Sequence, residues 1–193
     1  LGTAHGWPQG AIALEKIITK GDQNLERKLA EIGGKGLFTE ELEAGLRDGS
    51  LDLAVHSLKD LPTVSPQGLT LGAILPREDA RDVLVPRAGL AFSSLQDLPQ
   101  GARLGTASLR RGAQLLALRP DLQIEPLRGN VGTRMQRLET QDLQATLLAA
   151  AGLNRLALTP KGALPLDPTQ IIPAAGQGAL AVQCRSDDTD MLD

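Results

Sequence analysis

The sequence predicts an α/β protein with two lobes, and two observations support this prediction. Strand-like and helical patterns alternate along the 193 residues, which is typical of an α/β sheet whose strands are largely parallel. Breaks in this alternation at residues 76–82 and 173–178 enclose a middle unit, so we expect the chain to cross into a second lobe and return. We predict domain 1 over residues 1–78 with 177–193, and domain 2 over residues 83–173.

The expected elements of domain 1 follow from apolar runs and helix-boundary residues. Ala11–Thr19 reads as a first strand. Thr39 is placed to cap a helix whose first turn is acidic, and Gly49 is placed to end it. Apolar runs predict two further strands, over Leu51–His56 and Leu69–Leu75.

Domain 2 repeats a strand-and-helix unit. A short strand is predicted before Ser108, which caps a helix that Pro120 closes. We expect strands at Arg103–Thr106, Leu122–Leu127 and Leu143–Ala149, and a last strand, back in domain 1, at Ala179–Cys184.

Composition removes several function classes. The apolar content of 41% is ordinary for a globular protein, but only Trp7, Phe38 and Phe92 are aromatic, which argues against a single-stranded nucleic-acid binder. The longest apolar run, Ala145–Leu153, is about half of the roughly 20 residues that a membrane span needs. Cys184 is the single cysteine, and with two histidines it gives no zinc-like spacing, so we expect neither an internal disulfide nor a metal.

Charge is distributed unevenly along the chain. The net charge is -3, yet the stretch from Arg103 to Arg137 holds seven arginines against two acidic residues, a local charge of +5. The remaining residues therefore carry -8. Clustered arginines on an acidic protein favour a specific anionic ligand over a polyanion such as DNA.

Arg110 and Arg111 stand in the first turn of the helix that Ser108 caps. Cations are unfavourable there, because a helix N-terminus already carries partial positive charge. A docked anion would compensate for them. The alternative is that both are solvated surface arginines.

The same pattern follows the next two strands. Arg128 and Gly129 come directly after one strand, Arg134 lies one turn into the helix that follows, and Arg155 comes after the third strand. Successive strand ends would bring these arginines to one edge of the sheet. Since the planar fork of arginine suits bidentate binding of carboxylates, we expect a ligand with several carboxylates.

Ser57, Lys59 and Asp60 follow the strand at Leu51–His56, at the edge where open α/β sheets bind ligands. Asp60 beside Lys59 is a candidate acid/base group. A hydrolytic triad of His56, Ser57 and Asp60 is unfavourable, because neighbours on a strand point to opposite faces, and we expect His56 to be structural. A nucleotide site at Gly34–Leu37 is also unfavourable, since it lacks the Lys-Ser/Thr ending of a P-loop.

Six motifs in order resemble the hydroxymethylbilane synthase (porphobilinogen deaminase) family from about Lys16 to Asp188. They are Gly33–Phe38, Ala54–Pro62, Gly105–Arg111, Arg128–Arg134, Ala151–Arg155 and Gly176–Ala179. The resemblance implies a two-lobed, periplasmic-binding-protein-like type II architecture. It also implies a transferase that joins four porphobilinogens head to tail with loss of ammonia, on a covalently held dipyrromethane cofactor.

The resemblance also implies roles for individual residues. Asp60 matches the catalytic aspartate, which would stabilise a cationic azafulvene and shuttle pyrrole protons, and Lys59 would set its charge environment. The residues matching those that bind acetate and propionate side chains are Arg110, Arg111, Arg128, Arg134 and Arg155. Further contacts are implied for Lys35, Ser57, Thr106, Ser108 and Gly129.

The sequence departs from the family pattern in three places. The cofactor-bearing cysteine of the family lies in a third, C-terminal domain beyond this chain, and Cys184 is not expected to replace it. The N-terminal Thr-Arg-x-Ser segment is not matched, and Glu31 stands where the family often carries lysine. We therefore hypothesise a fragment or truncated form that is inactive alone. Expected partners are porphobilinogen and oligopyrrole intermediates, with a monomeric state and a cytoplasmic or plastid location.

Two alternatives remain open. A two-lobed solute-binding protein or regulator effector domain would also use arginines to bind carboxylates, without chemistry. A degenerate paralogue would retain the fold and bind only oligopyrroles.

Overall fold

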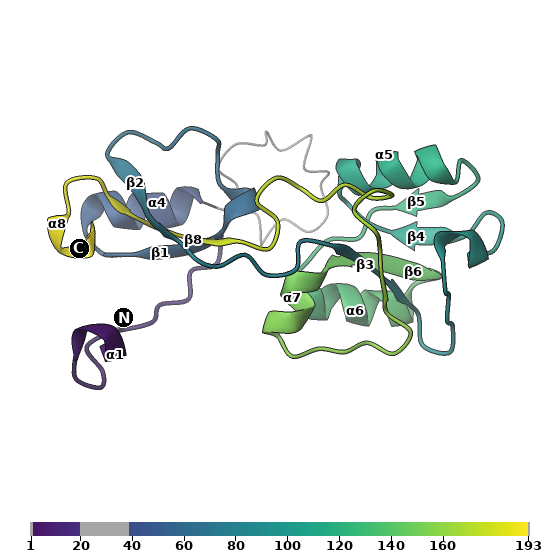
Figure 1. Cartoon of the computed structure of the whole chain (residues 1–193), viewed down its shortest axis with the longest axis horizontal. Coiled ribbons are helices and arrows are strands. Elements are labelled where there is room, and N and C mark those ends of the chain that lie inside the picture. Colours follow the sequence, from purple (N-terminus) through teal and green to yellow (C-terminus); the bar gives the residue numbers. More distant parts are fainter. Residues whose placement is uncertain (1, 20–38, 193) are drawn as a thin grey trace.

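The computed structural model describes residues 2–19 and 39–192, which form two lobes placed end to end (Figure 1). Each lobe is built on its own sheet. The first sheet contains three strands, β1 (Ala54–Ser57), β8 (Leu180–Arg185) and β2 (Leu69–Ile74), in that order. The second sheet follows the order β5-β4-β6-β3-β7, so all of its strands come from the middle of the chain.

The first lobe packs one helix against its sheet. In this helix, α4 (Glu40–Asp48), Thr39 takes the predicted N-cap position but its side chain makes no capping hydrogen bond, and Gly49 ends the helix with φ 79°, as predicted. Leu46 of α4 is fully buried against Ala54 and Leu69, which joins the helix to β1 and β2. Strand β8 is antiparallel to both of its neighbours.

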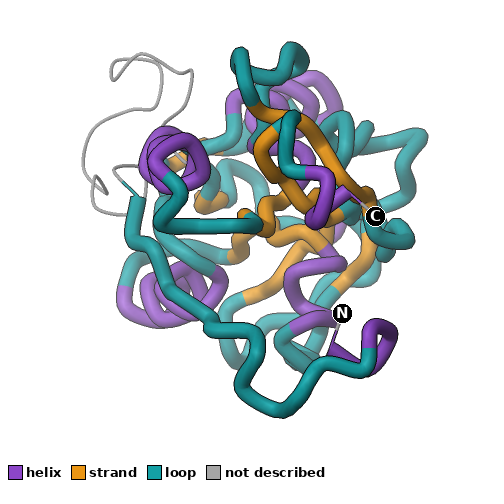
Figure 2. Tube along the Cα trace, turned by 90° about the vertical axis from the view of Figure 1, so that its left-hand side faces the viewer, coloured by secondary structure: helices purple, strands orange, loops and turns teal. Residues whose placement is uncertain are grey.

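The N-terminal residues lie outside both sheets. After the short helix α1 (Gly2–His5), residues 11–19 run as an extended loop (Figure 2). The prediction of a strand at Ala11–Thr19 is therefore wrong for this structure, since none of these residues pairs with a described strand. An apolar, β-branched run has strand propensity, but a strand also needs a neighbour for its backbone hydrogen bonds.

The second sheet mixes strand directions. Its members are β3 (Asp82–Pro86), β4 (Arg103–Gly105), β5 (Gln123–Glu125), β6 (Ala145–Ala149) and β7 (Leu164–Pro165). Strand β4 is parallel to β5 and β6, whereas β3 is antiparallel to β6 and β7. The expectation of a largely parallel sheet is thus correct only for β5-β4-β6, because a strand pattern in sequence does not reveal the direction of its partner.

Three helices alternate with the parallel strands. Helix α5 (Leu109–Leu118) follows β4, α6 (Val131–Thr140) follows β5, and α7 (Ala150–Arg155) follows β6. The remaining elements are the 3-10 turns η1 (Leu58–Asp60) and η2 (Leu95–Asp97) and the C-terminal helix α8 (Thr189–Leu192). Within the described ranges, no helix is long and apolar enough to cross a membrane.

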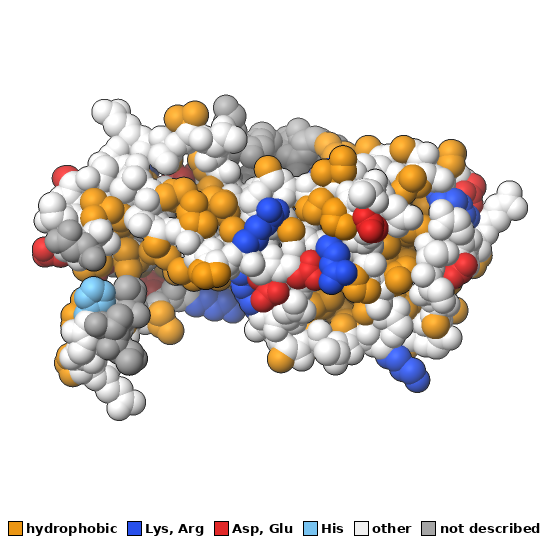
Figure 3. Space-filling view, viewed as in Figure 1, with side chains coloured by type: hydrophobic (Ala, Val, Ile, Leu, Met, Phe, Trp, Pro, Cys, Tyr) orange, Lys and Arg blue, Asp and Glu red, His pale blue; other side chains and the backbone are white. Residues whose placement is uncertain are grey.

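The chain passes between the lobes twice, between β2 and β3 and again before β8. The two crossings touch through their backbones, where the Glu78 amide donates to the Gly178 carbonyl at 3.0 Å. Gly178 has φ +93°, and a Cβ there would lie 2.4 Å from the Glu78 oxygen, so only glycine allows this approach. On the face seen in Figure 3, basic and acidic side chains gather where the lobes meet.

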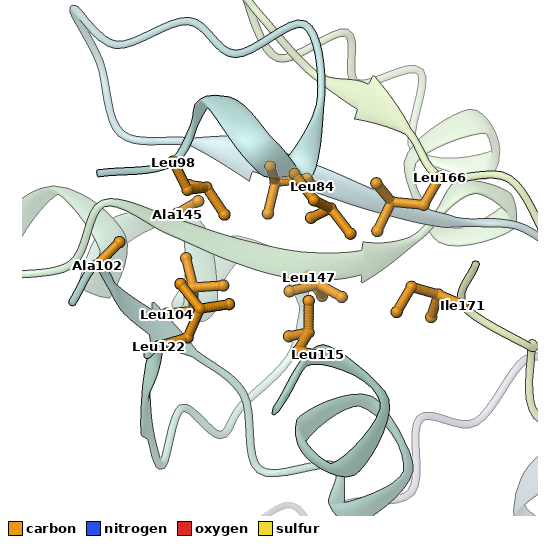
Figure 4. Packing of buried hydrophobic residues seen from close by; sticks show 11 residues of the cluster. Leu84, Leu98, Ala102, Leu104, Leu115, Leu122, Ala145, Leu147, Leu166 and Ile171 are labelled. Carbon is orange, nitrogen blue, oxygen red and sulfur yellow. The ribbon is translucent and has the colours of Figure 1, made fainter. Parts of the chain in front are cut away.

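The second lobe has a leucine-rich core on both faces of its sheet. Leu84, Leu104, Leu115 and Leu147 pack together on the α5 side (Figure 4). A second cluster on the opposite face holds Val83, Val85, Leu127, Leu138, Leu148 and Leu153, with side chains from α6 and α7. Alternate residues of β3 and β6 serve opposite clusters, as expected for strands that are covered on both faces.

Candidate functional site

The candidate site begins where β1 ends. Burial alternates along β1, so His56 points inward and Ser57 outward. This alternation confirms that His56 and Ser57 do not act on one face. The turn η1 then places Lys59 and Asp60 at the junction of the lobes, with side chains that solvent can reach although protein surrounds them on several sides.

The charges of Asp60 and Lys59 are both disfavoured by this position. Partial burial raises the pKa of the Asp60 carboxyl, against the opposing effect of the positive charges of Lys59 and Arg134. Partial burial likewise lowers the pKa of the Lys59 ammonium, against the attraction of Asp60, and Arg111 and Arg134 lower it further. Charges of the second lobe therefore act directly on the pair carried by the first lobe.

Parallel strands bring the predicted arginines to one edge of the second sheet. Arg110 and Arg111 follow β4, Arg128 follows β5, and Arg155 ends the helix after β6. Because β5, β4 and β6 are parallel neighbours, their carboxyl ends lie together, so Arg110, Arg111 and Arg128 follow strands that end at one edge, as expected from the sequence. Arg155 stands one helix further along the chain.

A buried carboxylate, Asp82, compensates for Arg110 and Arg111. The Nε and Nη2 atoms of Arg111 donate to Asp82 Oδ1 at 3.1 and 2.7 Å, and its Nη1 donates to the Leu147 carbonyl at 2.9 Å. Arg110 Nη2 lies 2.8 Å from Asp82 Oδ2. Burial alone would raise the pKa of Asp82, but the hydrogen bonds and charges of these arginines, together with Gln177, outweigh it and lower the pKa.

The sequence analysis left two alternatives for this arginine pair, a bound anion or solvation, and neither describes Arg111, which is buried against Asp82. The compensating anion belongs to the protein itself. Asp82 was missed because residues 76–82 read as a charged crossing, whereas residue 82 begins the fully buried strand β3. Ligand binding by Arg110 and Arg111 stays a prediction.

Arg134 adds a further positive charge to the site, close to Arg111 and Arg128. Burial lowers the pKa of its guanidinium, the charges of Arg111 and Arg128 lower it further, and Asp60 opposes them. Its Nε donates to the Gly129 carbonyl at 2.6 Å. No ion pair found within the described ranges includes Arg134. The site thus has a cationic side in the second lobe that suits a ligand with several carboxylates.

The remaining predicted residues support the same edge. The Thr106 hydroxyl accepts from the Ser108 amide at 3.1 Å, and Ser108 Oγ accepts from the Arg111 amide at 3.4 Å, so both hydroxyls fix the start of α5. Arg155 Nη2 donates to the Gly178 carbonyl at 2.7 Å, which joins α7 to the return crossing. Lys35 and Glu31 lie outside the described residues.

Cys184 and His56 are both buried in the first lobe. Burial raises the pKa of the Cys184 thiol, a setting that disfavours the reactive thiolate. His56 Nε2 lies 3.1 Å from Gln183 Oε1, and burial lowers the pKa of its imidazole, as expected for a structural histidine. Across the described residues, no cluster of three or more His, Cys, Asp or Glu side chains could hold a metal ion.

Comparison with known proteins assigns the chain to a family. A family model described as porphobilinogen deaminase, dipyromethane cofactor binding domain, matches residues 4–193. The chain is 48% identical over 190 residues to porphobilinogen deaminase of Paenibacillus macerans, covering 98% of this chain and 57% of the relative. It is 52% identical over 193 residues to that of Syntrophotalea carbinolica, covering 100% of this chain and 60% of the relative.

Among solved structures, the periplasmic VFT2 domain of Bordetella pertussis BvgS aligns with 79% of this chain and 63% of its own, with 18% identity and a TM-score of 0.47. The chain spans about three fifths of the length of the two curated relatives. The sequence match is continuous and covers both lobes and both crossings. The chain belongs to the porphobilinogen deaminase family.

Proposed function

We propose that the protein carrying this chain is a hydroxymethylbilane synthase, which joins four porphobilinogens head to tail with loss of ammonia. One observation carries the proposal beyond family membership: Asp60, a solvent-accessible carboxylate with a raised pKa, stands within the electrostatic reach of an arginine cluster on the other lobe. A polycarboxylate binder gains nothing from such a carboxylate, since it repels the ligand.

Asp60 is the proposed catalytic residue. A carboxylate beside the cleaved C–N bond would stabilise the positive charge that the substrate develops as ammonia leaves, and it could then accept the proton lost from the pyrrole ring. A raised pKa suits both tasks, because it strengthens the carboxylate as a base. Lys59 holds its neighbour in the ionised form by its own positive charge.

The arginine cluster is the proposed binding surface for acetate and propionate groups. Arg128 follows β5, Arg134 lies in the helix after it, Arg155 ends α7, and Arg110 and Arg111 pair with Asp82. Further proposed contacts are Lys35, Ser57, Thr106, Ser108 and Gly129. Domains over residues 1–78 with 177–193 and 83–173 are proposed from the two breaks in the strand and helix pattern. A monomeric state and a cytoplasmic location are proposed from the family.

The same cluster fits the dipyrromethane group of the family. That group bears carboxylates, and the mutual repulsion of Arg111, Arg128 and Arg134 would be relieved by them. When bound, it supplies the pyrrole on which chain growth starts. Arg128 and Arg134 would hold its carboxylates, and Asp60 would face the reacting end of the next substrate.

The experiment that tests the function is Asp60→Asn in the full protein. We expect turnover of porphobilinogen to fall by about 100-fold or more, as for the loss of a general acid/base group, with little change in substrate affinity. Asp52→Asn is the matched control, because Asp52 is an exposed aspartate of the same lobe that pairs with Arg185. Ammonia release and substrate binding are measured separately.

The outcomes separate the alternatives. Wild-type protein that binds porphobilinogen but releases no ammonia would establish the binding-only reading. Full turnover by Asp60→Asn would remove Asp60 from the mechanism. Intact mass before and after addition of porphobilinogen gives an independent reading, since a deaminase should show stepwise mass gains.

A further inference from the structure

Gln177 is buried at the point where the return crossing meets both lobes, and its contact with Asp82 is one of several that its side chain makes. It is 1% exposed and lies between Gly176 and Gly178. Its amide Nε2 donates to the Ala80 carbonyl at 2.7 Å and to Asp82 Oδ1 at 2.8 Å. Its amide Oε1 accepts from Lys59 Nζ at 3.4 Å, a long hydrogen bond.

These partners fix which way the amide faces. Ala80 and Asp82 offer only oxygen acceptors, so both amide hydrogens must point to them. The reversed amide would place its oxygen against the Asp82 carboxylate and its NH2 group against the Lys59 ammonium, and both contacts would repel. The side-chain carbonyl of Gln177 is therefore held toward Lys59.

The backbone around Gln177 is fixed as closely as its side chain. A Cβ on Gly176, where φ is +72°, would lie 3.0 Å from Leu58 Cγ and 3.2 Å from the backbone nitrogen of Lys59, so the crossing packs directly on η1. On the other side, Gly178 touches the first crossing at Glu78. Arg77 Nε also donates to the backbone carbonyl of Gln177 at 2.9 Å. The glutamine therefore cannot follow a displaced Lys59.

We propose that Gln177 is a positioning residue, whose amide holds the Lys59 ammonium beside Asp60 and holds Asp82 beneath Arg110 and Arg111. It links the catalytic turn of one lobe to the arginine edge of the other through a single side chain. The inference rests on the proposed function only for its catalytic consequence. The placement of Lys59 can be tested without turnover.

The first test measures the reactivity of the Lys59 amine in the full protein, by acetic anhydride labelling at pH 7.5 and peptide mass spectrometry. Gln177→Met keeps the size of the side chain but removes the acceptor, so the ammonium loses a hydrogen bond, its pKa falls further and labelling should rise about threefold. Gln177→Glu puts one carboxylate oxygen beside Lys59 and the other against Asp82 Oδ1, where the two carboxylates repel. The added negative charge attracts the Lys59 ammonium, so labelling should fall by at least as much. Opposite changes from two isosteric variants are not expected of loosened packing.

Controls lie within the same chain. Lys161, exposed in the second lobe, serves as the internal reference for labelling. Gln144→Met is the matched variant, because Gln144 also accepts a hydrogen bond with its side-chain oxygen, from the Arg103 amide at 2.6 Å, but lies at the opposite edge of the sheet. Gln144→Met should leave Lys59 labelling unchanged.

The second test measures turnover. We expect Gln177→Met to lower kcat about tenfold, with a smaller change in KM, and to shift the pH profile in the direction of the Lys59 change. The groups that face Lys59 are Asp60, Asp82, Arg111 and Arg134, so their variants are measured alongside.

Unchanged Lys59 labelling in both variants, with the fold intact, would overturn the positioning role even if the protein is an active deaminase. Changed labelling in a protein without any turnover would uphold the positioning role and remove the proposed function. If Gln177→Met does not fold, the test rests on Gln177→Glu. Labelling of Lys59 that rises or stays at the wild-type level in that variant overturns the proposal.

Discussion

Asp60 stands where its charge costs stability. Its pKa is raised in the folded state, so the folded protein binds a proton more readily than the unfolded chain does. Stability therefore decreases as pH rises between the ordinary carboxyl pKa and the raised one. This direction is the opposite of that for most aspartates, and it is typical of residues retained for function.

We therefore expect Asp60→Asn to increase the free energy of unfolding at pH 7 while it lowers turnover. The gain should disappear as pH falls below the ordinary carboxyl pKa, where the wild-type side chain is protonated in both states. Urea unfolding at pH 7 and pH 3.5 measures both values. A variant that is less stable at pH 7 would contradict the raised pKa.

Asp82 behaves in the opposite way. Its folded pKa is lowered, so its contribution to stability is present above the ordinary carboxyl pKa and is lost as pH falls through the lowered value. Asp82→Asn would leave the buried Arg111 without its carboxylate, and we expect a loss of about 3–5 kcal/mol in the free energy of unfolding at pH 7.

Denaturant unfolding measures this loss, with Asp142→Asn as the control. Asp142 pairs with Arg103 but is 71% exposed, so its removal should have a much smaller effect. Equal losses from the two variants would show that the buried pair adds nothing beyond a surface ion pair.

At the scale of residues, the sequence predicted the arginines but not their partner. Two arginines at a helix N-terminus violate a local rule, and such a violation can be seen in the sequence. Asp82 and Gln177 violate no rule. Their significance comes from contacts with residues 28 to 118 positions away, which only the folded chain reveals.

At the scale of elements, the helix caps position the arginines. Asn130 caps α6 by accepting from the Thr133 amide at 2.8 Å, and Arg134 lies in the first turn of that helix. We expect Asn130→Ala to lower the free energy of unfolding by about 1 kcal/mol and to weaken binding of porphobilinogen, since the cap orients Arg134.

Asn130→Ser tests the cause, because a serine hydroxyl can also cap and should restore most of both losses. Thermal unfolding and substrate titration give the two readings. If binding is unaffected while stability falls, the cap does not position Arg134.

Elements with strong end signals were predicted within a few residues. Helices α4 and α5 have an N-cap residue and a terminating glycine or proline in the sequence, and the structure confirms both. Strand β3 was missed, because its first residue is charged and belongs to a buried ion pair. Whether two strands pair in parallel or antiparallel could not be predicted from the sequence, since pairing depends on chain topology and not on local pattern.

At the scale of the whole molecule, the two lobes meet at a backbone contact. Gly178→Ala must accommodate both a left-handed residue and a Cβ that would stand 2.4 Å from the Glu78 oxygen. Gly89→Ala is the control, because Gly89 has φ +86° with no atom within 4 Å of the added Cβ.

We expect Gly89→Ala to cost about 1 kcal/mol of unfolding free energy and Gly178→Ala at least twice as much. Gly178→Ala should also separate the crossings, which small-angle scattering would detect as a larger radius of gyration. Equal costs for the two substitutions would show that the crossings part easily. The two-lobed layout itself was predictable, because two breaks in the alternating pattern mark the crossings.

The leucine-rich cores have a consequence for spectroscopy. Trp7 is the only tryptophan, the chain has no tyrosine, and Trp7 lies in the N-terminal segment outside both sheets. Its intrinsic fluorescence therefore does not report on either core. Within these 193 residues, a Trp7→Phe variant would be almost dark at tryptophan wavelengths, so one tryptophan introduced at the exposed Leu109 or Ile172 would be the only one in the chain.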